Sequence, residues 1–208
     1  MKNRYTLLLL AMVLLLAGCM GKPTRPAEFY VLSTTPGTPV SGTSAEAPLS
    51  LGLGPLTMPE IYDRPQIVTR GDANQIVLAE FDRWGGDLNK DLGRTLARNL
   101  MSRLNTDSIV PYPWSSRYAP DFQVTVRVFR FDGVPGENAV FEGIWRVLDA
   151  ARGCELAADR FTITEKTGGE GYPALVSAMS RAVATLSQAI AEQLAVTQPG
   201  CKESAATE

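Results

Sequence analysis

Cys19 is the residue whose surroundings most specifically predict a chemical reaction. It follows Leu16, Ala17 and Gly18, and this L-A-G-C sequence matches the bacterial lipobox, in which the cysteine thiol is acylated with diacylglycerol and becomes the first residue of the mature chain. At about 0.8 kcal/mol per buried methylene, several acyl chains would hold a protein on a membrane far more firmly than one myristoyl group. The sequence therefore predicts lipidation at Cys19.

The apolar run before Cys19 has the features of a signal peptide. Residues 7–17 supply about 11 apolar residues, whereas a helix needs about 20 to cross a bilayer. Lys2 and Arg4 provide the positive start of a secretory signal. We expect residues 1–18 to be removed; an ordinary signal peptide with an incidental cysteine is the alternative. Met20 replaces the aspartate that tends to retain Gram-negative lipoproteins at the inner membrane, which favours the periplasmic face of the outer membrane.

The two remaining cysteines, Cys154 and Cys201, are predicted to form a disulfide. An even number of cysteines in an oxidising compartment favours pairing, and two unrelated thiols are the alternative. The bridge would tie the C-terminal tail to a turn between strands. It would close a loop of about 47 residues, which corresponds to about 3 to 4 kcal/mol of stabilisation in the chain-entropy model.

The chain contains no histidine. This composition excludes Ser-His-Asp and Cys-His catalysis and the usual histidine-rich zinc sites. Gly52 and Gly54 are followed by Pro55 and not by the start of a helix, so they do not form a dinucleotide fingerprint. Catalysis by paired carboxylates stays possible, but the spacing singles out no pair. We expect a protein that is not an enzyme and has no catalytic residues, cofactor or metal.

Length and charge narrow the class of protein further. The 208 residues are enough for one domain of ordinary size, with residues 19–27 as a lipidated tether, 28–196 as the domain and 197–208 as a C-terminal tail. The formal net charge is -2 and the pI is about 5.3. Without a basic excess, nucleic acid is not an expected partner.

Strand patterns occupy most of the predicted domain. In residues 122–128, apolar side chains alternate with Gln123, Thr125 and Arg127, so one face of the sheet should be covered and the other wetter. Residues 34–48 are rich in Thr, Pro, Gly, Ser and Ala and are predicted to be a flexible surface loop. Apolar runs that alternate or are β-branched predict strands at residues 29–32, 49–53, 66–70, 75–81, 109–112, 122–131, 140–148 and 156–165.

Two amphipathic helices are predicted to cover the apolar face. Leucines recur every four residues from Leu88 to Leu104, with Asp87 placed as the N-cap. A second apolar stripe runs from Leu175 to Leu194, after Pro173. We expect an α+β fold, with a mixed, largely antiparallel β-sheet and two long helices packed on one face, in a single domain.

Several stretches together resemble the PqiC (YmbA) family of ABC-type transport auxiliary lipoproteins. They are the lipobox, FYVL, LGLGPLTMPEIYDRPQIVTR, LAEFDRWGGDL, VPYPW, FRFDG and ALVSAMSRAVATLSQAIAEQL, and they cover essentially the whole mature chain. The most specific pieces are residues 62–70 and 80–84, whose order and spacing both fit. The Cys154 and Cys201 pair is a departure from the family's hallmark residues.

The resemblance implies a function in lipid transport between membranes. A member of this family would be an outer-membrane lipoprotein that works with an MCE-domain protein, a periplasmic lipid-binding tube or ring tethered to an inner-membrane transporter. It would act as a non-catalytic docking component that supports outer-membrane integrity, and it could form a homo-oligomeric ring to match the MCE assembly. The fold that the family implies is a mixed sheet with two helices on one face.

Five residues in the most specific pieces are candidate partner contacts: Tyr62, Asp63, Arg64, Arg70 and Trp84. The two arginines could present guanidinium groups to a carboxylate or a lipid phosphate. The structural alternative is that Asp63 and Arg64 fix the entry to a hairpin, and that Trp84, like Tyr112 and Trp114, packs against the sheet.

Two further functions remain as alternatives. The protein could be a periplasmic carrier that holds an acyl chain between its helices and its sheet, although the apolar residues suffice only to fill its own core. A lipid-modifying enzyme would have to work without histidine.

Overall fold

The computed structural model describes residue 3 and residues 25–41, 49–72, 74–115 and 117–201. Cys19 and the predicted signal peptide therefore lie outside the described residues, apart from Asn3. The domain limits stay predictions. Within the described part, every predicted strand and helix is present, and several strands are longer than their apolar patterns suggested.

The larger of two sheets has five strands in the order β5-β2-β6-β7-β8. β6 pairs antiparallel with β7, and β7 with β8, whereas β2 runs parallel to both β5 and β6. The sheet is therefore mixed and largely antiparallel, as predicted. Its strands are β2 (Leu51–Thr57), β5 (Ile109–Pro111), β6 (Phe122–Val134), β7 (Asn138–Asp149) and β8 (Glu155–Lys166).

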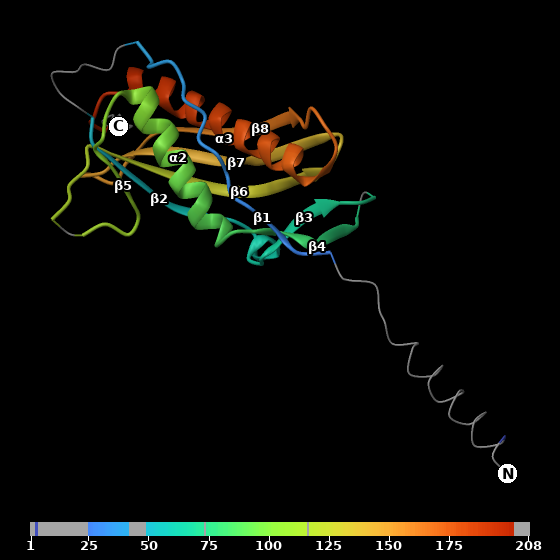
Figure 1. The fold of residues 1–208 in the computed structure, drawn as a ribbon. Helices are drawn as coiled ribbons and strands as arrows, with labels where there is room; N and C mark the ends of the chain where they lie inside the picture. Colours follow the sequence, from blue (N-terminus) through green and yellow to red (C-terminus); the bar gives the residue numbers. More distant parts are fainter. Residues whose placement is uncertain (1–2, 4–24, 42–48, 73, 116, 202–208) are drawn as a thin grey trace.

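A smaller sheet of three strands, in the order β1-β4-β3, stands at one end of the larger sheet (Figure 1). β3 (Gln66–Arg70) and β4 (Ile76–Trp84) form the predicted antiparallel hairpin. β1 (Glu28–Tyr30) pairs parallel with the end of β4, where Glu28 is opposite Asp82. The first described residues of the chain thus lie beside this hairpin.

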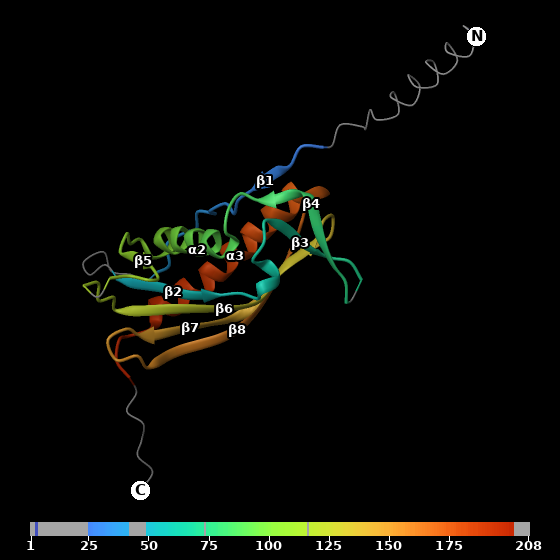
Figure 2. The same cartoon turned by 90° about the horizontal axis from the view of Figure 1, so that it is seen from below.

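Both long helices cover one face of the larger sheet, which Figure 2 shows from the side. α2 (Leu88–Leu104) contacts β2 and β5, and α3 (Gly171–Val196) contacts β6, β7 and β8. The predicted leucines of α2 and the stripe of α3 are buried against the sheet and against each other. The expectation of an α+β domain with two helices on one face is confirmed.

The ends and the environment of the helices follow from their sequences. The Asp87 side chain accepts a hydrogen bond from the Lys90 backbone N–H, as an N-cap does, and α2 ends where Asn105 adopts a left-handed conformation. By length and composition, α3 is the one helix among the described residues that could cross a membrane. Because 67% of its most apolar window is buried inside the fold, α3 is a core helix.

Residues 31–40, which we call the strap, lie across both helices (Figure 1). The backbone N–H groups of Leu32 and Thr35 donate to Asp91 and Asn99 on α2, and that of Ser33 donates to Ser180 on α3. Residues 34–40 form the predicted surface loop, without helix or strand, and the hydrogen bonds connect it to α2. Backbone hydrogen bonds to side chains of distant helices fix this segment, and they leave no periodic pattern in its own sequence.

A disulfide joins Cys154, which follows the turn between β7 and β8, to Cys201 beyond the end of α3. The Cα atoms are 5.9 Å apart, within the range of unstrained bridges. Nearby, the Gly200 N–H donates to Asp149 at the end of β7, 2.9 Å away. The bridge and this hydrogen bond hold the chain after α3 against the end of the sheet.

We expect the paired substitution Cys154→Ser/Cys201→Ser to lower the free energy of unfolding by about 3 to 4 kcal/mol, because the loop of 47 residues is then open in the unfolded chain. Urea denaturation without reductant would measure the difference. Wild-type protein in reductant is the matched control and should lose the same amount. An unchanged midpoint would show that the bridge does not constrain the unfolded chain.

Candidate functional site

A buried carboxylate joins the two sheets. Asp132 on β6 is fully buried, and its oxygens accept hydrogen bonds from Arg130 Nε at 2.7 Å, Arg70 Nε at 2.9 Å and the Tyr62 hydroxyl at 2.9 Å. Arg70 ends β3 of the smaller sheet, whereas Asp132 and Arg130 belong to the larger sheet. We call these four residues the Asp132 cluster. It fastens the end of β3, next to the hairpin turn, to the last part of β6.

The electrostatics of the Asp132 cluster are those of a paired buried charge. The hydrogen bond to Asp132 raises the pKa of Arg70 above its ordinary value. Burial, reinforced by the neighbouring Asp132 carboxylate, raises the pKa of Tyr62 to about 12. The Tyr62 oxygen also accepts from the Phe131 backbone N–H at 3.1 Å. Tyr62 therefore stays protonated at neutral pH and acts as a donor and an acceptor together.

The Asp132 cluster fixes both ends of the segment 62–70, which we call the signature segment. The single 3-10 turn η2 (Glu60–Tyr62) leads into Asp63, Arg64 and Pro65, and β3 follows. The Pro65 carbonyl accepts from the Trp84 backbone N–H at 2.7 Å, which links the segment to the end of β4. Asp63 and Arg64 thus occupy a short loop that is anchored on three sides.

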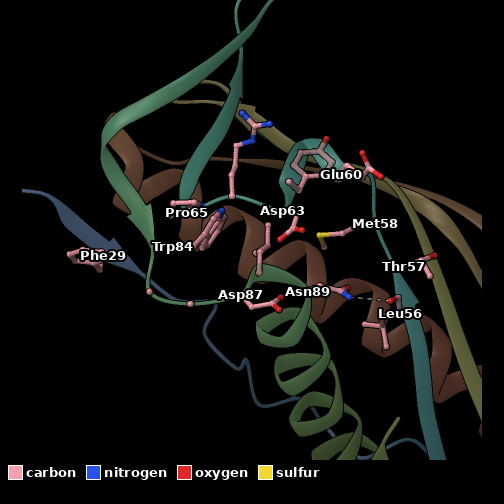
Figure 3. Close-up of a pocket in the computed structure, with 15 residues that line it drawn as sticks. Phe29, Leu56, Thr57, Met58, Glu60, Asp63, Pro65, Trp84, Asp87 and Asn89 are labelled. Atoms are coloured by element: carbon pink, nitrogen blue, oxygen red, sulfur yellow. Dashed lines mark hydrogen bonds between the residues drawn. The ribbon is translucent and has the colours of Figure 1, made fainter. Parts of the chain in front are cut away.

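A pocket of about 730 Å³ opens beside this loop, between the end of β4 and the first turn of α2 (Figure 3). We call it the signature pocket. In Figure 3, Trp84 lies next to Pro65, and Met58 and Asp63 lie between them and Asn89. The lining residues come from β1, β2, the signature segment, the end of β4 and the start of α2: Phe29, Leu56, Thr57, Met58, Glu60, Tyr62, Asp63, Arg64, Pro65, Trp84, Gly85, Gly86, Asp87, Leu88 and Asn89.

The lining of the signature pocket is amphipathic and carries a net negative charge. Its three carboxylates, from Glu60, Asp63 and Asp87, face a single cation, Arg64. In the described part of the chain, the Nε of Arg64 and the Oδ1 of Asn89 are shielded from solvent and have no hydrogen-bond partner. Shielded polar groups are nearly always paired in native proteins, so these two atoms on the wall of the pocket are exceptions, as are Asn99 Nδ2 and Thr167 Oγ1 elsewhere in the described chain.

A second, more apolar pocket of about 590 Å³ lies along α2, beside β2 and β5. We call it the α2 groove. It shares Leu56 and Asn89 with the signature pocket, so the two are adjoining parts of one surface. Three cationic side chains, Lys90, Arg94 and Arg98, also line it. The remaining lining residues are Leu53, Pro55, Gly93, Ala97, Met101, Ile109, Pro111 and Tyr112.

The structure assigns different surroundings to the five candidate contacts. Tyr62 and Trp84 are buried, with 3% and 4% of their surfaces exposed, although both border the signature pocket. Arg70 is engaged with Asp132, and Asp63 and Arg64 form the pocket wall. The structure thus brings four of the five to one pocket; that any of them contacts a partner stays a prediction.

Sequence reasoning missed several residues of this region. The sequence patterns include Asp132 only as part of the FRFDG stretch, and they do not identify Met58 or Asn89 as candidate site residues. Tyr112 and Trp114, which were both predicted to pack against the sheet, lie in different surroundings. Trp114 is half-buried over Gly52, and a Cβ atom added to Gly52 would come within 2.5 Å of the Trp114 ring. Tyr112 is 56% exposed.

No group of three or more His, Cys, Asp or Glu side chains that could hold a metal ion occurs among the described residues. The three acids of the signature pocket, Glu60, Asp63 and Asp87, are exposed to solvent. The chemistry that this arrangement offers is recognition by charge, hydrogen bonds and apolar contact.

Comparison with known proteins places the chain in a family. The sequence model described as "ABC-type transport auxiliary lipoprotein component" matches residues 30–191, which include the whole of both pockets except Phe29. The protein belongs to this family of ABC-type transport auxiliary lipoproteins. The resemblance to the PqiC-like lipoproteins is thereby confirmed. Among curated proteins, none matches the chain.

Solved structures share the fold at low sequence identity. An uncharacterized protein aligns with a TM-score of 0.66 and 22% identity over 82% of this chain and 99% of its own. Protein XCC0632 from Xanthomonas campestris aligns with a TM-score of 0.67 and 15% identity over 81% and 95%. The PelC dodecamer from Paraburkholderia phytofirmans has a TM-score of only 0.41 at 13% identity over 74% and 92%, too distant to bear on assembly.

The Asp132 cluster predicts a large effect of its carboxylate on stability. Asp132→Ala should lower the free energy of unfolding by about 3 kcal/mol or more, since two guanidinium groups and a buried hydroxyl lose their shared acceptor. Chemical denaturation would measure this change in the free energy of unfolding. Asp107→Ala, at an exposed position, is the control and should change stability by no more than about 0.5 kcal/mol. Equal effects would contradict a linking role for Asp132.

The raised pKa of Tyr62 predicts a loss of stability in alkali. Since its pKa is about 12 in the folded protein and 10.0 ordinarily, the folded state holds the proton more tightly. Its contribution is complete below pH 10 and is lost as the pH rises towards 12. The free energy of unfolding should therefore fall more steeply across this interval in wild type than in Tyr62→Phe. Parallel pH profiles of the two proteins would count against this assignment.

Proposed function

We propose that this protein is a lipoprotein anchored through Cys19 to the periplasmic face of the outer membrane, where it docks an MCE-domain protein of an inner-membrane lipid transporter. It takes part in lipid movement between the membranes without catalysing a reaction, and so supports outer-membrane integrity. Membership of the auxiliary lipoprotein family supports a role beside an ABC-type transporter. The lipobox and the following Met20 support the site of anchoring.

The observation that carries the docking role is the signature pocket. Arg64 and Asn89 line it together with Glu60, Asp63 and Asp87, a mixture of donors and acceptors that suits a peptide segment. The three carboxylates of the lining disfavour a phosphate headgroup and favour a segment with basic side chains. Trp84, Met58 and Leu56 add apolar surface at the base. A protein partner fits this combination better than an anionic lipid does.

The second candidate function is a lipid carrier, and the α2 groove is the observation that favours it. Its apolar lining could hold part of an acyl chain, with Arg98 and its neighbours near a phosphate. The space between the helices and the sheet, where a carrier would need its cavity, is instead filled by buried side chains such as Phe131, Phe141 and Leu186. A carrier would therefore have to hold its lipid at the edge of the fold.

We expect Arg64→Ala to reduce the MCE-domain protein that co-purifies with the tagged lipoprotein from detergent-solubilised membranes by about tenfold, since arginines at the centre of an interface commonly contribute that much. Mass spectrometry of bound proteins and lipids would measure the change. Arg160→Ala, an exposed arginine on β8, is the matched control and should keep wild-type recovery. Cys19→Ala should abolish lipidation and release the protein from the membrane fraction.

Two results would overturn the docking role. Recovery of stoichiometric phospholipid with no protein partner would make this protein a carrier. If Arg64→Ala and Arg160→Ala reduced the recovery of the MCE-domain protein equally, the signature pocket would not be part of the interface. Asp63→Lys provides a second variant, because reversing one carboxylate should weaken a basic partner segment and strengthen a phosphate ligand.

A further inference from the structure

The hairpin of the smaller sheet exposes three consecutive apolar side chains. Ile76, Val77 and Leu78, at the start of β4, have exposed fractions of 38%, 40% and 41%. Successive side chains of a strand point to opposite faces, so both faces of the hairpin are apolar near its tip. Single exposed apolar residues are common on protein surfaces, but a contiguous group on a projecting element marks an interaction surface.

The pairing of β1 with β4 places the base of this hairpin beside the chain that leads to the predicted lipid anchor. The two strands are parallel, with Glu28 opposite Asp82 and Tyr30 opposite Trp84. This pairing sets the direction of only the last three residues of β4, because the register shift between Gln66 and Val68 bends the strand before them. Figures 1 and 2 show the first described residues and the hairpin at the same end of the domain, opposite the end that carries Cys201.

The predicted tether is longer than the part of β4 that leads to the hairpin tip. Eight residues lie between Cys19 and Glu28, and the nine steps from one to the other span at most about 30 Å. Five residues lie between Ile76 and Asp82, and this bent part of β4 spans at most about 20 Å. A lipid attached at Cys19 therefore keeps the bilayer within reach of the hairpin tip.

The charges near the tip indicate how such a contact would be made. Asp72 and Glu80 are exposed, and Arg70 is engaged with Asp132. The other cation of the hairpin, Arg83, lies at the far end of β4, so apolar burial is the contact that residues 76–78 offer at the tip. A weak apolar contact suffices, because the tether confines the hairpin at a high effective concentration beside the membrane.

We propose that residues 76–78 insert into the headgroup and upper acyl region of the membrane that holds the lipid of Cys19. The occupant of this apolar surface is a phospholipid bilayer, and the hairpin is a second point of membrane contact that sets the orientation of the domain. The inference rests on the proposed anchoring at Cys19 and not on the docking of an MCE-domain protein.

The test is depth-dependent quenching with the full lipidated protein in vesicles of phosphatidylethanolamine and phosphatidylglycerol. Val77→Cys would be labelled with an environment-sensitive nitrobenzoxadiazole fluorophore. Ala151→Cys, an exposed position in the turn after β7, is the matched control. Doxyl-labelled lipid should quench the label at Val77 at least twofold and leave that at Ala151 unchanged. Because the contact is apolar, the quenching should persist at high salt and in vesicles of neutral phosphatidylcholine.

Two outcomes would overturn the proposal. A label at Val77 that stays in water while the protein remains vesicle-bound would show that the lipid anchor works without the hairpin. A label that is shielded only after an MCE-domain protein is added would make residues 76–78 a protein interface, and the docking function would stand. Circular dichroism checks that the variants fold. If Val77→Cys does not fold, Ile76→Cys provides a second position for the label.

Discussion

The hydrogen bonds to the Asp132 carboxylate are the interaction on which the rest of the structure depends. A carboxylate with no exposed surface is costly unless its oxygens are paired, and here two arginines and a tyrosine from three separate segments provide the partners. Tyr62 and Arg70 bracket Asp63 and Arg64, so the same hydrogen bonds that stabilise the carboxylate also position the wall of the signature pocket. A structural core contact thereby positions the wall of the candidate site.

The local elements were predictable because their signals lie within a few residues of each other. The four-residue spacing of leucines predicted α2 over the range that the structure shows, and the alternation in β6 predicted its covered face. The pairing of strands was not predictable in the same way. That β2 lies between β5 and β6, and that β1 runs parallel to β4, depends on contacts between distant segments that leave no local pattern.

The candidate site was predictable in part. Resemblance directed attention to residues 62–70 and 80–84, which do meet at one pocket. The acid that organises them could not be found from its surroundings, because Asp132 stands beside Gly133 in a segment that reads as the approach to a turn. Asn89 likewise lies in the first turn of an amphipathic helix, where a polar residue is ordinary. Burial of such groups becomes evident only when the sheets and helices are assembled.

The strap also determines how the domain would respond to force. Tension applied through the N-terminus of an anchored chain would act along the axis of β1 and then on the strap, whose backbone is bonded to Asp91 and Asn99 on α2 and to Ser180 on α3. A force along β1 acts in shear on the hydrogen bonds between β1 and β4, so these bonds carry the force together and do not open one after another. Such a force would therefore pass from β1 through the strap to α2 and α3.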